Sequence, residues 1–258
     1  MEKKTIVVTG STRGIGLGLV TEFLKLGHQV VINGRTSEKL EQVLEDLKKL
    51  SSDVTGVVGN VNDASTHMAL VEKAVSTFGK IDIWVNNAGI PQPHRSFIDI
   101  ELKDIQAITE VNIYGLMLGT KTAANFMLRQ GFGKIFNMEG FGSDGRMMKK
   151  LSLYGTTKRA VNYFTKSVSL EMEGLPIELG ILSPGMVRTD FLKNTDNPRT
   201  PEEEKQFKKV YEILAEDADV VTQFLVIGML KSNKHYDRIE FLSGWRLASK
   251  LIRLMLKG

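Results

Sequence analysis

A tyrosine and a lysine, Tyr154 and Lys158, lie four residues apart in a segment with helical periodicity over 153–173. Residues four apart share one face of a helix, so the two side chains should lie close together. A phenol with an ordinary pKa of about 10 is a poor base at neutral pH, and a nearby ammonium group favours its phenolate form. The pair is therefore a candidate for acid–base chemistry. The same spacing is common on amphipathic helices, so the other motifs of the chain decide its meaning.

A glycine-rich turn lies between the first predicted strand, 5–8, and a predicted helix, 15–26. Glycines let the backbone approach a pyrophosphate, whose charge is stabilised by the free N–H groups of a helix N-terminus. A plain tight turn is the alternative, but a strand before it and a helix after it favour a dinucleotide site. The expected cofactor-binding residues of this turn are Gly10, Ser11, Thr12, Arg13, Gly14, Ile15 and Gly16.

The end of the second predicted strand indicates which dinucleotide binds. A carboxylate at this place would hydrogen-bond the adenosine ribose hydroxyls and repel a 2′-phosphate. The sequence instead has Asn33-Gly34-Arg35, with no acid before Glu38. Arg13 in the glycine turn and Arg35 could bracket a phosphate with charge-assisted hydrogen bonds. We therefore expect NADP(H) rather than NAD(H); the alternative is that both arginines are merely solvated.

Strand-like and helix-like segments alternate along the chain. The predicted strands cover 5–8, 30–32, 54–58, 81–85, 134–137 and 177–182, and the predicted helices cover 15–26, 37–50, 64–78, 101–130 and 153–173. Repeated strand–helix units with right-handed crossovers form a parallel sheet with helices on both faces. The pattern predicts an α/β protein with a single Rossmann-like, doubly wound sheet. No linker-like stretch interrupts it, so we expect one domain over residues 1–258.

Two segments depart from this alternation. Residues 191–219 are polar and charged and follow the sixth strand, where an α/β sheet carries its ligand, so we expect a substrate-loop excursion bearing a helix. Residues 239–242 could be a last strand, and 244–258 form a basic, amphipathic tail that is predicted to be a C-terminal helix. Its apolar surface must cover something: the protein's own body, a sister subunit, or a membrane surface or bulky apolar substrate.

Composition and charge exclude several classes of function. The chain of 258 residues has no cysteine, which removes disulfides and thiolate chemistry, and its four histidines lack metal-ligand spacing, so no metal is expected. Residues 241–258 carry four bases and no acid, which leaves the rest of the chain neutral and gives no sign of a nucleic-acid surface. The longest apolar run, 224–230, is too short to span a bilayer. The segment before Gly10 is too short for a signal-peptide core, so a cytoplasmic protein is expected.

Taken together, the motifs resemble those of the short-chain dehydrogenase/reductases. The matching segments are Thr9-Gly10-x-x-x-Gly14-x-Gly16, Asn86-Asn87-Ala88-Gly89, Asn112, Tyr154-Gly155-Thr156-Thr157-Lys158 and Ser183-Pro184-Gly185-Met186-Val187-Arg188-Thr189. The resemblance covers about residues 3–190. It implies that Tyr154 protonates a carbonyl oxygen during reduction, that Lys158 also holds the nicotinamide ribose, and that Asn112 orders a water relay.

The same resemblance implies a larger cofactor site and an oligomer. Besides the glycine turn and Arg35, the implied cofactor-binding residues are Asn60, Val61, Asn87, Ala88, Gly89, Tyr154, Lys158, Pro184, Gly185, Val187 and Thr189. The cofactor supplies the hydride, and protein groups orient and polarise the reactants. The family commonly pairs its subunits through the helices equivalent to 101–130 and 153–173, so a homodimer or homotetramer is expected.

One position departs from the family pattern. The polarising serine of the family usually follows the fifth strand in an Asn-x-Ser-Ser pattern, but here Glu139 and Gly140 occupy the two serine places. Ser143 is the nearest hydroxyl; it either donates the missing hydrogen bond as a catalytic residue or is an ordinary loop serine. The departure, with residues 218–221 and 238–244, resembles the chlorophyll b reductase branch, whose members use NADPH to reduce a ring formyl group.

The sequence therefore predicts an NADP(H)-dependent reductase of a carbonyl in a small-molecule, hydrophobic substrate, with a chlorin formyl group as one candidate. A generic reductase of oxoacyl, steroid-like or sugar carbonyls is the alternative within enzymes. A scaffold or sensor that binds NADPH without turnover is the alternative outside them, motivated by Glu139 and Gly140.

Overall fold

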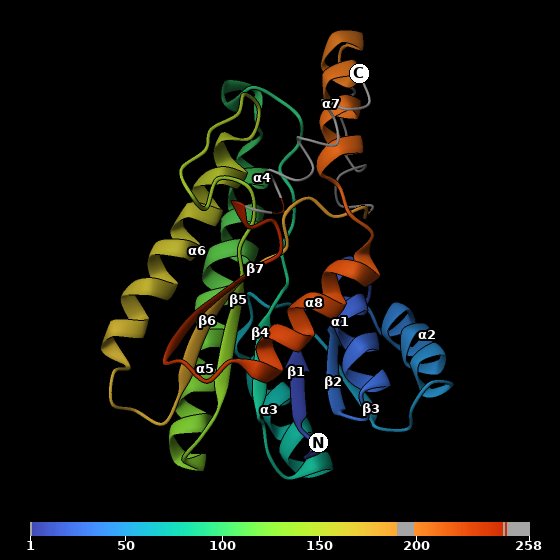
Figure 1. Ribbon diagram of the computed structural model, residues 1–258, viewed down its shortest axis with the longest axis vertical. Helices are drawn as coiled ribbons and strands as arrows, with labels where there is room; N and C mark the ends of the chain where they lie inside the picture. The colour runs from blue at the N-terminus through green and yellow to red at the C-terminus, as the bar shows by residue number, and fades with distance from the viewer. Residues whose placement is uncertain (1, 190–198, 245, 247–258) are drawn as a thin grey trace.

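The computed structural model describes residues 2–189, 199–244 and 246. Its strands are all parallel and form one sheet in the order β3-β2-β1-β4-β5-β6-β7 (Figure 1). Their bounds are β1 (Thr5–Val8), β2 (Gln29–Gly34), β3 (Val54–Val58), β4 (Ile83–Asn86), β5 (Lys134–Met138), β6 (Glu178–Ser183) and β7 (Tyr236–Glu240). The strand order reverses between β1 and β4, and in such sheets a crevice for ligands opens there at the carboxyl ends of the strands.

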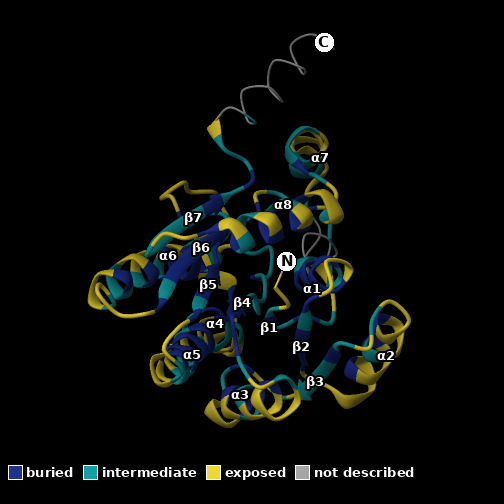
Figure 2. Cartoon of the chain, turned by 60° about the horizontal axis from the view of Figure 1, so that its bottom comes forward, coloured by how far each residue is buried: buried dark blue, intermediate teal, exposed yellow. Residues whose placement is uncertain are grey.

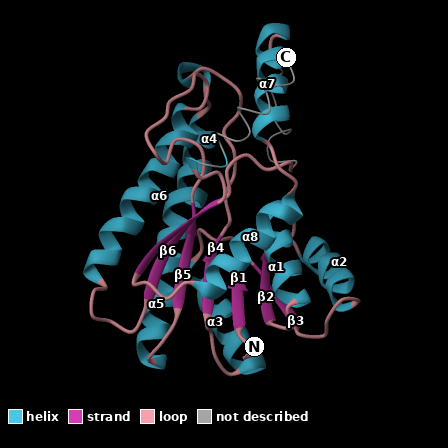
Figure 3. Ribbon diagram, in the orientation of Figure 1, coloured by secondary structure: helices cyan, strands magenta, loops and turns pink. Residues whose placement is uncertain are grey.

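Helices cover both faces of the sheet, as Figure 3 shows. One face packs against α1 (Gly14–Lys25), α2 (Ser37–Lys48) and α8 (Ala218–Lys231), and the other against α3 (Ala64–Phe78), α5 (Leu116–Gln130) and α6 (Ser152–Glu171). Successive side chains of a strand point to opposite faces. In β1, accordingly, Ile6 and Val8 join one apolar cluster and Val7 the other. The predicted α/β, doubly wound fold is confirmed.

The strands form the buried centre of the molecule, while the outer helix faces are exposed (Figure 2). All four residues of β1 and all four of β4 are buried. Strands covered on both faces need apolar residues at nearly every position, which explains why these segments read as continuous β-branched runs rather than alternating ones.

Three elements differ from the sequence predictions. The predicted helix 101–130 is divided into α4 (Leu102–Thr109), a π-helical segment (Glu110–Gly115) and α5. The last strand is β7, Tyr236–Glu240, three residues earlier than predicted, because its first residues are polar and only its pairing with β6 makes them a strand. Helix α8 was not predicted at all; its apolar run surrounds the helix, so no amphipathic stripe marks it.

The predicted excursion after β6 does contain a helix, α7 (Pro201–Leu214), which begins with a capping box between Thr200 and Glu203. Residues 190–198 of that excursion lie outside the described residues, as does the predicted tail helix apart from residues 244 and 246. The guanidinium of Arg246 lies over the rings of Phe224 and Phe241, at 4.3 and 4.5 Å from their centres. Among the described helices, none has the length and apolar character to cross a membrane.

Candidate active site

The glycine turn after β1 brings bare backbone to the carboxyl edge of the sheet. Gly10 has a φ of +60°, and a Cβ there would lie 2.7 Å from the Cα of Ala88, which no side chain could accommodate. A Cβ on Gly16 would lie 2.6 Å from the carbonyl oxygen of Gly10. The Nδ2 of Asn87 donates to the carbonyl oxygens of Thr9 and Gly10, at 3.0 Å each, and holds the turn against the loop after β4. The helix N-terminus behind this turn can receive a pyrophosphate.

Two arginines flank the end of β2. Arg13 is the residue before α1, Arg35 follows β2, and both side chains are exposed. A Cβ on Gly34 would lie 2.5 Å from the Cγ2 of Thr12, so the glycine turn packs in direct contact with the end of β2. The side chain of Asn33 is already hydrogen-bonded within the protein, because its Oδ1 accepts from the backbone N–H of Gly10 at 3.2 Å. Neither arginine forms an ion pair with a carboxylate of the described residues.

The other predicted cofactor residues line the same edge. The methyl group of Thr189 lies 3.7 Å from where a Cβ on Gly14 would be, which brings the segment after β6 to the glycine turn. In that segment Pro184 and Val187 are buried, and Gly185 has a φ of +72°. Asn60 and Val61 follow β3, and the carbonyl of Val61 is bonded to the Nε2 of His67 at 2.7 Å. These segments all follow the carboxyl ends of their strands, and their roles toward a cofactor stay predictions.

Tyr154 and Lys158 lie together on α6, above the end of β5. The Nζ of Lys158 is 5.7 Å from the centre of the Tyr154 ring and donates to the carbonyl oxygen of Met138 at 3.1 Å. A Cβ on Gly140 would lie only 2.5 Å from the hydroxyl oxygen of Tyr154 and 3.4 Å from the Cε of Lys158. The two chemical groups therefore share one small space, which is open to them because residue 140 has no side chain.

Burial controls the protonation of this pair. It raises the pKa of Tyr154 above its ordinary value. Burial also lowers the pKa of Lys158 to about 8, against the opposing effect of the negative charge of Glu139. The sequence predicted that the ammonium group would lower the tyrosine pKa; among the protein's own groups, burial has the larger effect, because a phenolate loses its hydration there. Tyr154 is consequently a protonated acid at neutral pH.

Asn112 connects the loop after β4 to α6. It is fully buried in the π-helical segment, where its Oδ1 accepts from the N–H of Ile90 at 2.8 Å and its Nδ2 donates to the carbonyl of the same residue at 3.0 Å. The Nδ2 also lies 3.2 Å from the hydroxyl of Thr157 on α6. An extra residue in a helical turn re-aims the side chains around it, and π-helical turns are frequent at functional sites. The predicted water relay at Asn112 stays a prediction.

Ser143 is buried at the start of a largely exposed loop, where the loop packs against the first turn of α6. A Cβ on Gly142 would lie 2.6 Å from the Cα of Gly155, and the side chain of Arg159 donates to the carbonyl of Ser143 at 2.8 Å. The backbone N–H of Ser143 donates to the carbonyl of Gly140 at 3.1 Å. The serine is thus held beside the Tyr154 turn, and the catalytic role of its hydroxyl stays a prediction.

Two site residues escaped sequence reasoning as functional groups. The buried carboxylate of Glu139 pairs with Arg238 of β7 at 2.6 Å and accepts from the Nδ2 of Asn162 at 3.0 Å. A buried acid requires a cationic partner, but that partner is distant in sequence. Gln92 is also buried: its Oε1 accepts from the N–H of Tyr154 at 2.8 Å, and its Nε2 donates to the carbonyl of Lys150 at 2.6 Å. No sequence motif marks this glutamine.

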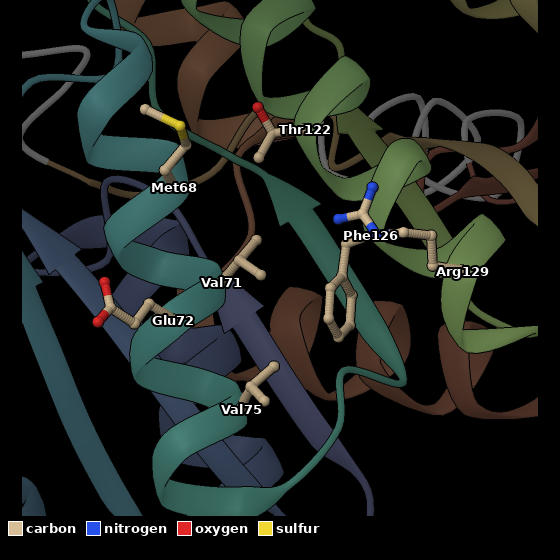
Figure 4. Close-up of a pocket in the computed structure, with 7 residues that line it drawn as sticks. All are labelled: Met68, Val71, Glu72, Val75, Thr122, Phe126 and Arg129. Atoms are coloured by element: carbon tan, nitrogen blue, oxygen red, sulfur yellow. The ribbon is translucent and has the colours of Figure 1, made fainter.

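A separate groove of about 290 Å³ opens between α3 and α5 (Figure 4). It shares no residue with the site described above, and its lining comes from the outward sides of two helices: Met68, Val71, Glu72, Val75, Thr122, Phe126 and Arg129. The groove therefore does not contribute to the chemistry at the carboxyl edge of the sheet.

The similarity to known proteins extends over nearly the whole chain. Residues 4–200 match the family model described as short chain dehydrogenase. The chloroplastic chlorophyll(ide) b reductase NOL of Oryza sativa subsp. japonica is 37% identical over 264 residues, which cover 98% of this chain and 75% of the relative. Its namesake from Arabidopsis thaliana is 35% identical over 98% of this chain and 74% of its own length. The crystal structure of a 3-ketoacyl-(acyl-carrier-protein) reductase from Brucella melitensis complexed with NADH superposes with a TM-score of 0.80 and 26% identity, covering 95% and 99% of the two chains.

These relatives correct one expectation and establish another. Both reductases are named as chloroplastic, which contradicts the predicted cytoplasmic location. That prediction rested on the lack of a long apolar segment, a property that does not distinguish one aqueous compartment from another. The family match, the identity over nearly the full chain and the parallel sheet agree with one another. The chain therefore belongs to the short-chain dehydrogenase/reductase family.

Proposed function

We propose that this oxidoreductase uses NADPH to reduce a carbonyl group of a large hydrophobic substrate, with the formyl group of chlorophyll b or a related chlorin as the leading candidate. The observation that carries the reaction class is the placement of the Tyr154 hydroxyl beside Lys158 and over Gly140. The choice of substrate rests on similarity to chlorophyll(ide) b reductases along nearly the whole chain, together with Glu139-Gly140 in place of the family serines.

The residues present fit a nicotinamide dinucleotide. The bare backbone at Gly10 and Gly16 matches the close approach that a pyrophosphate requires. Arg13 and Arg35 would hold a 2′-phosphate, because both are exposed beside the end of β2 with no carboxylate paired to them among the described residues. Lys158 would hold the nicotinamide ribose. When bound, the cofactor supplies the hydride.

The protein's own part in the reaction is to give one proton to the carbonyl oxygen. Tyr154 holds that proton on its hydroxyl at neutral pH, because burial raises its pKa. Lys158, with a pKa near 8, is mostly charged at pH 7 and stabilises the phenolate that remains after transfer. Ser143 is our candidate for the hydrogen bond that polarises the carbonyl, and Asn112 for ordering the relay that returns the proton to Tyr154.

The test is NADPH oxidation with a formyl-bearing chlorin offered beside small aldehydes. We expect turnover of the chlorin to a hydroxymethyl product and a loss of at least a hundredfold in kcat for Tyr154→Phe. Tyr163→Phe is the matched control, since Tyr163 is an exposed tyrosine on the same helix. Turnover of small carbonyl compounds but not of the chlorin would reject the chlorin as the substrate. Binding of NADPH without turnover of any carbonyl would favour the scaffold alternative.

A further inference from the structure

The first turn of α6 lacks a cap of its own. The residue before the helix is Leu151, whose apolar side chain cannot accept a hydrogen bond from the free N–H groups that begin every helix. Tyr154 is the third residue of the helix, so the acceptor of its backbone N–H cannot be a carbonyl of the helix itself. The helix that carries the proposed proton donor therefore needs an acceptor from elsewhere in the chain.

Gln92 supplies that acceptor and also a donor. In a helix that continued backwards, the N–H of Tyr154 would bond to the carbonyl of Lys150, four residues earlier. Lys150 instead adopts a φ of +62°, the one non-glycine residue with positive φ among the described residues. The side-chain amide of Gln92 joins the two separated groups: its Oε1 accepts from Tyr154 at 2.8 Å and its Nε2 donates to Lys150 at 2.6 Å.

The glutamine is itself held in place. Only 3% of its surface is exposed, and it lies in the same loop as Ile90, whose backbone N–H and carbonyl are both hydrogen-bonded to Asn112. Of the neutral side chains, a primary amide alone offers a carbonyl acceptor and N–H donors in one rigid plane. A side chain with only one of these functions would leave either the Tyr154 N–H or the Lys150 carbonyl without its partner.

We propose that Gln92 is a positioning residue for Tyr154: it fixes where α6 begins and so holds the phenol over Gly140. The space above Gly140 is narrow, because the Tyr154 hydroxyl oxygen lies only 2.5 Å from where a Cβ on Gly140 would be. A small shift of the first helical turn would therefore move the hydroxyl away from the carbonyl to be reduced, and misplacements of about 1 Å can cost up to a hundredfold in rate. The inference rests on the proposed role of Tyr154 in carbonyl reduction.

The experiment uses two variants of Gln92 and a matched control. Gln92→Met keeps the length of the side chain and removes both hydrogen bonds. Gln92→Glu keeps an acceptor for Tyr154, and its protonated form also has a donor for Lys150, so it resembles glutamine only at low pH. Gln130→Met is the control: Gln130 likewise bonds backbone groups, those of Ile81, but at the opposite end of the sheet. Each protein is measured for kcat, NADPH affinity, Tm and the hydrogen-exchange rate of the Tyr154 amide.

We expect Gln92→Met to lower kcat by roughly tenfold to a hundredfold, with NADPH affinity within about twofold of the wild type and a fall in Tm no larger than that of Gln130→Met. The kcat of Gln92→Glu, relative to the wild type, should rise as the pH falls and its carboxyl group takes up a proton. Gln92→Met should show no such recovery.

Equal losses of kcat in Gln92→Met and Gln130→Met would overturn the inference. So would a kcat of Gln92→Glu, relative to the wild type, that does not change with pH. If the wild-type protein reduced no carbonyl, the proposed function would fail. The hydrogen-exchange rate of the Tyr154 amide would then test separately whether Gln92 holds the start of α6. Faster exchange at Tyr154 in Gln92→Met than in Gln130→Met would support the bridge, and equal exchange would reject it.

Discussion

At the scale of single residues, Gly140 explains why the family serine is missing from its usual place. The hydroxyl of Tyr154 lies so close to Gly140 that any Cβ there would collide with it. A side chain at residue 140 would therefore force the Tyr154 phenol to shift, which gives a steric reason for glycine in place of the family serine. Glu139, the other departure, turns toward Arg238 and Asn162 and is a buried charge near Lys158.

Restoring a serine at residue 140 should harm the enzyme. Gly140→Ser would push the Tyr154 phenol out of position, so we expect kcat to fall by about tenfold to a hundredfold while NADPH affinity is retained. Steady-state kinetics and cofactor titration measure both quantities. Gly155→Ala is the control next to the same tyrosine, because its added Cβ would meet nothing closer than 3.8 Å. An active Gly140→Ser enzyme would contradict the geometry.

The pH dependence should follow Lys158. Because burial lowers its pKa to about 8, the ammonium charge is present below that pH and is lost above it, so kcat/KM should fall as the pH rises through about 8. Glu139 opposes this shift, so Glu139→Gln should lower the lysine pKa further and move the fall of kcat/KM to lower pH. A pH–rate profile measures the midpoint. Glu240→Gln is the control, since Glu240 also contacts Arg238, at 3.4 Å. Identical midpoints for wild type and Glu139→Gln would refute this assignment.

At the scale of elements, helix α7 is tied to the loops beside the active site. The ammonium of Lys150 donates to Glu203 in the first turn of α7 at 2.6 Å, and His94 lies 3.5 Å from the same carboxylate. The hydrogen bonds from Lys150 and from the N–H of Thr200 lower the pKa of Glu203 to about 2, so the carboxylate stays charged at any pH of interest. These contacts hold the start of α7 within the excursion that is expected to shape the substrate pocket.

Removing this ion pair should affect the substrate rather than the cofactor. We expect Lys150→Met to raise KM for bulky carbonyl substrates by up to about fivefold, the upper range for one exposed ion pair, and to leave NADPH affinity unchanged. Lys208→Met, which removes a lysine paired with Glu204 on the outer part of α7, is the control. An unchanged KM in Lys150→Met, or an equal rise in both variants, would show that this contact does not shape the pocket.

At the scale of the whole molecule, the parallel sheet gathers loops that are far apart in sequence. The glycine turn, the loop after β4, the end of β5 and the segment after β6 all leave the same edge, because every strand runs in the same direction. A ligand bound across this edge contacts several strand–helix units at once. Its binding free energy therefore adds to the stability of the whole fold.

Cofactor binding should consequently raise the melting temperature, by an amount that grows with the logarithm of the affinity. At a concentration of about 100 Kd, a ligand adds about 2.7 kcal/mol, which corresponds to roughly 5–10 °C for a chain of this size. We expect NADPH to raise the melting temperature more than NADH does at equal concentration. In Arg35→Ala this difference between the two cofactors should be smaller. Arg129→Ala, at an exposed arginine on α5, is the control. Equal shifts by NADPH and NADH in the wild type would reject the predicted preference.

Local sequence determined much of this molecule. The strand–helix alternation predicted the sheet, the glycine turn was predicted between its strand and helix, and the spacing of Tyr154 and Lys158 predicted that they share a helical face. These features depend on periodicity and backbone conformation, which neighbouring residues dictate. The polar start of strand β7 and the whole of helix α8 escaped prediction because neither carries such a periodic signal.

Only the tertiary structure decided how the site is completed. The contacts of Gln92 with Tyr154 and of Glu139 with Arg238 join residues 62 and 99 positions apart, and the close approach of Gly140 to the phenol depends on where α6 packs over β5. Such contacts follow from the packing of whole elements, and burial then sets the protonation of Tyr154 and Lys158. The sequence by itself therefore determined which groups can do the chemistry, whereas the packing of distant segments decided how those groups are held and charged.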